Sequence, residues 1–111
     1  MRLIIDRKRW LRGTGEAHSY LQRKSDKKMC CVGFYACMLG YKKKDIIECA
    51  ILDHLRDPSL VPDWCAKAGY EKSDIRQLYI TNDDKVLTDT LRERKIRKLF
   101  AKHGVTVMFR G

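Results

Sequence analysis

Residues 29–40 read MCCVGFYACMLG and form the most apolar stretch of the 111-residue chain. Glycine readily adopts the left-handed conformation that closes many helices, so Gly40 predicts the end of one. At helical spacing, one face of the stretch carries Cys30, Phe34, Cys37 and Met38. We therefore predict a central helix over about 29–39 with this face buried, and with Gly33 allowing another backbone to approach closely.

Two further helices are expected after this one. The first covers about 45–56, because Asp45 and Glu48 have the spacing of a capping box and Pro58 stops a helix that precedes it. The second covers about 87–103 and stops before a glycine. Both stretches repeat apolar residues at helical spacing, which predicts one buried face on each helix.

Short strands are expected near the two ends of the sequence. Leu3-Ile4-Ile5 is a β-branched apolar run, and residues 105–110 alternate apolar and polar side chains. Because a lone strand leaves its backbone groups unpaired, we expect these two strands to pair with each other. Residues 73–80 are compatible with a helix capped by Ser73 or with a strand, and both alternatives stay open.

These elements predict a single α+β domain over residues 1–111. Its body is compact and helical, and a small sheet pairs the N- and C-terminal strands. The length is enough for one domain and too short for two, and an apolar fraction of 44% is ordinary for a globular protein. Residues 6–28 are expected to form a loop that Trp10 and Leu11 anchor to the core.

The charge of the chain is high and unevenly distributed. With 24 Lys and Arg against 14 Asp and Glu, the net charge is +10. Residues 1–44 hold 12 basic and 3 acidic residues, residues 45–90 hold 5 and 10, and residues 91–111 hold 7 and 1. If the two ends meet in the fold, one face is basic, and a basic face attracts anionic partners.

The expected helix at 87–103 carries the clearest cluster of positive charge. Its apolar side holds Ile96, Leu99 and Phe100. The opposite side holds Arg94, Arg97, Lys98 and Lys102. Because like charges on one helix face repel each other, we interpret this face as a binding surface. Basic runs elsewhere supply further candidates for the same role: Arg7, Arg9, Arg12, Lys42, Lys43 and Lys44.

A cysteine-dependent enzyme is an alternative that rests on the adjacent Cys30 and Cys31. They open the central helix, and a helix N-terminus favours a thiolate; His18 is a candidate base. The spacing matches no cysteine-enzyme signature, however, and cysteine is common in protein cores. We therefore expect both thiols to be structural and the protein to have no catalytic residues.

No cofactor and no metal site are expected. The five cysteines and three histidines contain neither the C-x-x-C nor the H-x-x-x-H spacing typical of zinc ligands. Asn82-Asp83-Asp84 offers the oxygen ligands that Mg²⁺ prefers. The same residue types are common in turns and in helix caps, and we interpret them as a turn or cap before the last helix.

Four motifs cover separate parts of the chain: WLRG at 10–13, KMCCVGF at 28–34, NDD at 82–84 and LFAKHGV at 99–105. Together they resemble a group of small accessory proteins encoded by tailed bacteriophages. Small phage proteins of this kind commonly modify host machinery or block host defences. The resemblance implies a bacteriophage origin and a bacterial host as the setting, and by analogy with such accessory proteins we expect binding to a host component.

The sequence also indicates a compartment and a functional class. An odd number of cysteines, no apolar signal segment after Met1 and no apolar run of about 20 residues predict a cytoplasmic protein with reduced thiols and no membrane association. We expect a non-catalytic binding protein whose basic face engages an acidic surface on a host enzyme or defence component. Binding of nucleic acid through the same face is the close alternative, and the cysteine enzyme is the second.

Overall fold

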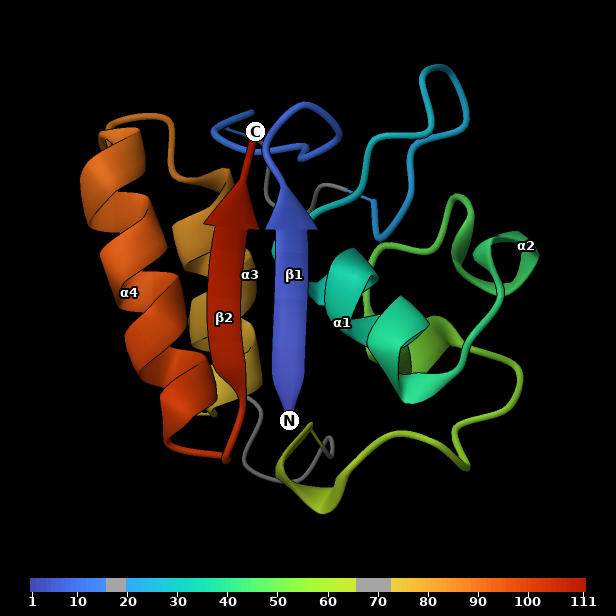
Figure 1. Ribbon diagram of the computed structural model, residues 1–111. Coiled ribbons are helices and arrows are strands. Elements are labelled where there is room, and N and C mark those ends of the chain that lie inside the picture. Colours follow the sequence, from blue (N-terminus) through green and yellow to red (C-terminus); the bar gives the residue numbers. More distant parts are fainter. Residues whose placement is uncertain (16–19, 66–72) are drawn as a thin grey trace.

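The computed structural model describes residues 1–15, 20–65 and 73–111. Strand β1 (Arg2–Asp6) near the N-terminus and strand β2 (Thr106–Arg110) near the C-terminus run parallel, with Leu3 opposite Val107 (Figure 1). Parallel strands need a long crossover connection, and here almost the whole chain supplies it. The predicted pairing of the terminal strands is confirmed.

Helices occupy much of the crossover. The α-helices are α1 (Cys31–Leu39), α2 (Lys43–Ile46), α3 (Asp74–Asp83) and α4 (Asp89–Ala101). Two short 3-10 helices are η1 (Leu52–His54) and η2 (Asp63–Cys65). Helix α4 packs on β2 and on α3, while α1 packs on β1 and on α3, so α3 lies between the two halves (Figure 1). The result is a compact α+β globule, as predicted from the sequence.

Helix α1 ends where the sequence predicts, but it buries a different face. Gly40 closes it in the left-handed conformation at φ 112°. The fully buried side chains of the helix are Cys31, Val32, Tyr35 and Ala36. The predicted face is only partly buried beyond Cys30, since Phe34, Cys37 and Met38 remain half-buried. Because the stretch is apolar on every side, its contacts with β1 and α3 decide which face is covered.

The helix predicted over 45–56 is wrong. Within this range, α-helix is limited to the end of α2 (Lys43–Ile46), and the 3-10 helix η1 covers Leu52–His54. Asp45 lies in the first turn of α2, where its carboxylate accepts a hydrogen bond from the Lys42 backbone at 3.1 Å. Glu48 adopts φ 60°, which breaks the helix. The chain turns there to pair with residues 21–22, and the Glu48 amide donates to the Gln22 carbonyl at 2.9 Å. This tertiary pairing replaces the helical hydrogen bonds.

Helices α3 and α4 follow capping rules. The open question over residues 73–80 is settled as helix, because the Ser73 hydroxyl accepts a hydrogen bond from the Arg76 backbone at 3.3 Å. Thr88 caps α4 in the same way, because its hydroxyl accepts a hydrogen bond from the Leu91 backbone at 3.3 Å. Helix α4 therefore lies within the range predicted from the sequence, about 87–103. Asn82 and Asp83 therefore end α3 rather than cap α4.

The core is continuous beneath the sheet and α1. Tyr35, Phe100 and Trp64 form an aromatic cluster in which the Tyr35 and Phe100 ring centroids are 5.1 Å apart. Trp10 is buried against Phe109 at 5.0 Å, which confirms that the N-terminal loop is anchored to the core. In the described parts of the chain, no helix is long and apolar enough to cross a membrane.

Candidate binding surface

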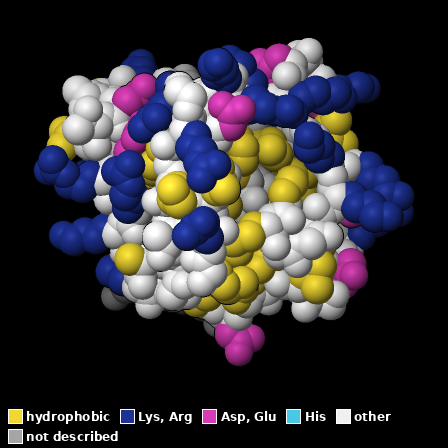
Figure 2. All heavy atoms as spheres, in the orientation of Figure 1, with side chains coloured by type: hydrophobic (Ala, Val, Ile, Leu, Met, Phe, Trp, Pro, Cys, Tyr) yellow, Lys and Arg dark blue, Asp and Glu magenta, His cyan; other side chains and the backbone are white. Residues whose placement is uncertain are grey.

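The solvent face of α4 is a ridge of positive charge. Ile96 and Phe100 on the opposite face are fully buried, which fixes the orientation of the helix. The basic side chains that this orientation leaves exposed are Arg94, Lys95, Arg97 and Lys98 of α4 and Lys102 at its C-cap. In Figure 2, Lys and Arg side chains line the side of the molecule formed by α4 and the opposite side formed by α2. We call Arg94, Lys95, Lys98 and Lys102 the basic ridge.

Most side chains of the basic ridge make no ion pair with an acidic residue in the part of the chain that the structure describes. Within the described residues, Arg94, Lys95 and Lys98 make no ion pair, and Lys102 reaches Asp74 only at 3.6 Å with its side chain 58% exposed. Neighbouring cations on a helix repel each other by a few tenths of a kcal/mol per pair. The ridge therefore keeps a charge that an anionic partner can neutralise.

Two of the predicted binding residues instead hold the fold together. Arg7 donates two hydrogen bonds to Glu93 at 2.7 and 2.8 Å, and the Glu93 carboxylate raises the pKa of Arg7. Arg97 approaches the same carboxylate at 3.5 Å and stacks over the Phe109 ring at 5.0 Å. These contacts tie the N-terminal loop and β2 to α4, so neither arginine belongs to the basic ridge.

Lysines of the ridge border a groove between α3 and α4. The groove has a volume of about 220 Å³ and is lined by Gln77, Thr81, Lys95, Lys98, Leu99 and Lys102. Two exposed aliphatic residues lie on the same helices within one turn of its lining: Ile80 follows Gln77 by three residues on α3, and Leu91 precedes Lys95 by four residues on α4. Cationic and apolar groups are thus combined on one surface, a combination that suits an acidic partner with apolar side chains.

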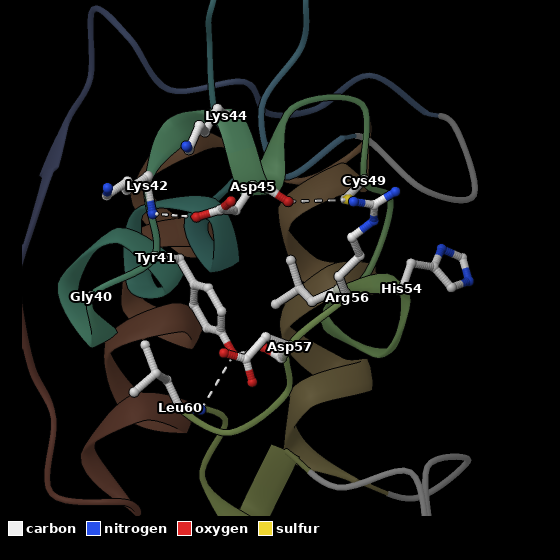
Figure 3. Close-up of a pocket in the computed structure, with 11 residues that line it drawn as sticks. Gly40, Tyr41, Lys42, Lys44, Asp45, Cys49, His54, Arg56, Asp57 and Leu60 are labelled. Atoms are coloured by element: carbon white, nitrogen blue, oxygen red, sulfur yellow. Dashed lines mark hydrogen bonds between the residues drawn. The ribbon is translucent and has the colours of Figure 1, made fainter.

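The predicted candidates Lys42, Lys43 and Lys44 lie on α2 and its cap, far from the ridge in Figure 1. Lys42 and Lys44 border a hollow of about 710 Å³ together with Arg56 and Asp57 (Figure 3). Basic and acidic side chains are mixed around this hollow, so it does not extend the basic ridge.

The remaining predicted candidates, Arg9 and Arg12, lie in the N-terminal loop. Arg9 is exposed. Arg12 donates to Asp89 at 3.1 Å and to the carbonyl groups of Arg7 and Trp10 at 2.9 and 3.1 Å. The hydrogen bonds from Arg12 lower the pKa of Asp89. Arg12 is therefore a structural residue. The fold brings Arg7 and Arg12 to α4, but there they pair with its acidic residues Glu93 and Asp89, and the α2 lysines lie elsewhere, so the predicted single basic face does not form.

The thiols on which the enzyme alternative rests are inaccessible. Cys30 and Cys31 are buried, and burial raises the pKa of Cys30 to about 12 and that of Cys31 well above its usual value. A nucleophilic thiol needs the opposite shift and access to substrate. The candidate base His18 lies outside the described residues. Within the described part of the chain, no group of His, Cys, Asp or Glu side chains is arranged to hold a metal ion.

Thiol labelling of the folded protein tests whether Cys30 and Cys31 are less accessible than the other cysteines. We expect Cys37 and Cys49, which are half-buried, to react with a thiol reagent well before Cys30 and Cys31. Mass spectrometry of peptides taken at successive times gives the order. Early modification of Cys31 in protein that keeps its native circular dichroism would contradict the buried placement.

Asn82 is a structural residue whose role the sequence did not reveal. Its side-chain oxygen accepts hydrogen bonds from the Trp10 indole at 2.8 Å and from the Cys31 backbone at 3.0 Å. Its amide nitrogen donates to the Leu11 carbonyl at 2.9 Å and to the Asp83 carboxylate at 3.0 Å. The interpretation of Asn82-Asp83-Asp84 as a turn before the last helix missed this role, because the partners are at least 50 residues away in sequence, apart from Asp83.

A comparison of the chain with protein-family models finds no match, and comparisons with curated proteins and with solved structures find none either. Function is therefore inferred from the contacts, burial and charge of the residues themselves. Of the features described above, the basic ridge with its adjoining groove is the one that combines accessibility, unneutralised charge and apolar contact area.

Proposed function

We propose that this protein is a phage-type accessory binding protein that acts without catalysis. Its basic ridge engages an acidic surface on a bacterial host protein, such as an enzyme or a defence component. The observation that carries the proposal is the exposure of Lys95 and Lys98 beside a groove, with the exposed Ile80 and Leu91 within one helical turn of its lining residues Gln77 and Lys95. All five cysteines are free thiols, which supports a reducing cytoplasm as the site of action.

An acidic protein is favoured over nucleic acid by the side chains next to the lysines. Single-stranded nucleic acid is typically bound by exposed aromatic rings beside cations. The exposed apolar residues that adjoin the groove are the aliphatic Ile80 and Leu91, while Trp10 is buried. Aliphatic side chains provide contact area for a protein partner, and the lysines speed its association electrostatically.

Charge reversal on the ridge tests the proposal. Lys95→Glu with Lys98→Glu is expected to reduce capture of a host protein from nuclease-treated bacterial lysate by about tenfold or more, equal to about 1.4 kcal/mol. Arg97 is left unchanged because it contacts Glu93 and Phe109. Glu forms helices about as well as Lys, so α4 is expected to persist, which circular dichroism checks.

The matched control is Lys24→Glu with Lys27→Glu, which makes the same charge change on an exposed loop. This control is expected to capture the host protein as well as the wild type does. Equal capture by all three proteins would show that the ridge is only solvated. Loss of all capture on nuclease treatment would favour the nucleic-acid alternative, for which the wild type should then bind with a marked dependence on salt.

A further inference from the structure

A second concentration of positive charge lies at the base of the N-terminal loop, away from the groove of the ridge. A hollow of about 530 Å³ is bordered there by Arg12, Arg23, Lys28, Lys85, Arg92 and Asp89. These residues come from the N-terminal loop, the segment before α1, the α3–α4 connection and the first turns of α4. The hollow thus has five basic side chains and one carboxylate. Only the fold brings them together, because they come from separate segments of the sequence.

Two of the cations are fixed in place by the backbone. Arg92 is buried and donates to the carbonyl groups of Thr81 at 3.3 Å and Leu87 at 3.0 Å, and also to that of Asp84. Arg12 is held by the contacts with carbonyl groups described above. Both arginines also bind Asp89, so the one carboxylate of the hollow is already neutralised.

The other cations leave the hollow with excess positive charge. Within the described residues, Lys28 and Lys85 make no ion pair, and Arg23 pairs with Asp26, a residue that does not line the hollow. The N-terminus of α4, a helix of 13 residues, begins at the same place and adds its dipole. A concave site of one sign concentrates the electric field and attracts the opposite charge.

Glycines in the loop let these cations lie close to the backbone. Gly15 has φ 75°, and a Cβ atom there would stand 2.9 Å from the Cδ atom of Lys85. Gly13 has φ 63°, and a Cβ atom there would stand 3.1 Å from an Arg92 nitrogen. The loop therefore has no side chains where Lys85 and Arg92 lie against it.

From this geometry we infer that the hollow binds a compact polyphosphate, either free or as the phosphate chain of a nucleotide. Two lysines that make no ion pair within the described residues, next to three arginines that share two carboxylates, leave a surplus of positive charge that favours an anion with several charges over a single carboxylate. The volume lies within the range of about 300–1,000 Å³ usual for small-molecule sites. Trp10 borders the hollow but is buried, so it offers no ring face on which a base could stack.

Isothermal titration with inorganic pyrophosphate tests the site. Wild-type protein is expected to bind it saturably at low salt, and Lys28→Gln with Lys85→Gln is expected to weaken binding about tenfold or more. Arg12 and Arg92 are left unchanged because they hold the fold. The control, Lys24→Gln with Lys43→Gln, removes two exposed charges outside the hollow and is expected to bind like the wild type. Thermal melting checks that all three proteins are folded.

Equal weakening in the two variants, or no saturable binding by folded wild type, would overturn the inference. Titration with ATP and with adenosine separates the possible sources of the phosphate chain. Pyrophosphate binding at least as tightly as ATP identifies a free polyphosphate, and tighter ATP binding identifies a nucleotide. Binding of adenosine, or of ATP without any binding of pyrophosphate, would overturn the inference because a base would then carry recognition. None of these outcomes depends on the basic ridge.

Discussion

Gly33→Ala is expected to destabilise the protein by at least about 3 kcal/mol, the upper end of the usual range for overpacking. A Cβ atom at this position would stand 1.9 Å from the Leu21 carbonyl oxygen and 3.0 Å from the Met29 Cβ atom. Leu21 cannot easily retreat, because its amide donates to the Cys49 carbonyl at 2.6 Å. Urea denaturation followed by circular dichroism measures the loss of unfolding free energy.

Gly104→Ala is the informative comparison for this change. Gly104 has φ 75°, but apart from its two neighbours in the chain no described residue has an atom within 4 Å of the Cβ position. An alanine there meets only the cost of a left-handed conformation, about 1–2 kcal/mol. Gly33 has an ordinary helical φ, so if its substitution cost no more than that of Gly104, the close approach of Leu21 would be too weak to explain why residue 33 is glycine.

Asn82→Ala is expected to cost about 3–5 kcal/mol of unfolding free energy. The change leaves the Trp10 indole, the Cys31 amide and the Leu11 carbonyl without their Asn82 partner in the protein interior. Each buried polar group left unsatisfied costs about 1–3 kcal/mol. The loss is expected to loosen the N-terminal loop from α1 and α3, and a rise in the quenching of tryptophan fluorescence by iodide, compared in a Trp64→Phe background, would report it.

The matched control for Asn82 is Gln77→Ala, on the exposed side of the same helix. A surface change of this kind is expected to alter stability by no more than about 0.5 kcal/mol. Denaturation of the two variants under one set of conditions separates the hydrogen-bond network from helix propensity. If Asn82→Ala lowered the unfolding free energy as little as Gln77→Ala does, water would have replaced the hydrogen bonds of the Asn82 amide, and the network would not stabilise the fold.

Local sequence signals succeeded where the responsible interactions are local. The end of α1 at Gly40 and the extent of α4 depend on glycine conformation and on helical periodicity within a few residues. They failed over 45–56, where pairing of residues 47–49 with residues 21–22 overrides a capping pattern. A pattern of neighbouring residues cannot predict such a pairing, because the two paired segments are separated by about 25 residues in the sequence.

The candidate sites show the same division. Exposure of Arg94 and Lys98 followed from the buried positions of Ile96 and Phe100 on the same helix, so periodicity alone placed them correctly. Arg97 has a similar position in the helical pattern, yet its guanidinium contacts the Phe109 ring and the Glu93 carboxylate. Whether a basic side chain is available for binding thus depends on neighbours that the sequence does not identify.

The sequence by itself determined the α+β class, the terminal strand pairing, and the central and last helices. Each of these follows from local backbone preferences or from a periodic pattern of apolar residues. Only the tertiary structure decided which face of α1 is buried and which arginines form ion pairs with Glu93 and Asp89. It also decided that Lys28 and Lys85 border one hollow. The physical reason is that ion pairs and hydrogen bonds act over a few ångströms, and distant segments come within that range only after the core has packed.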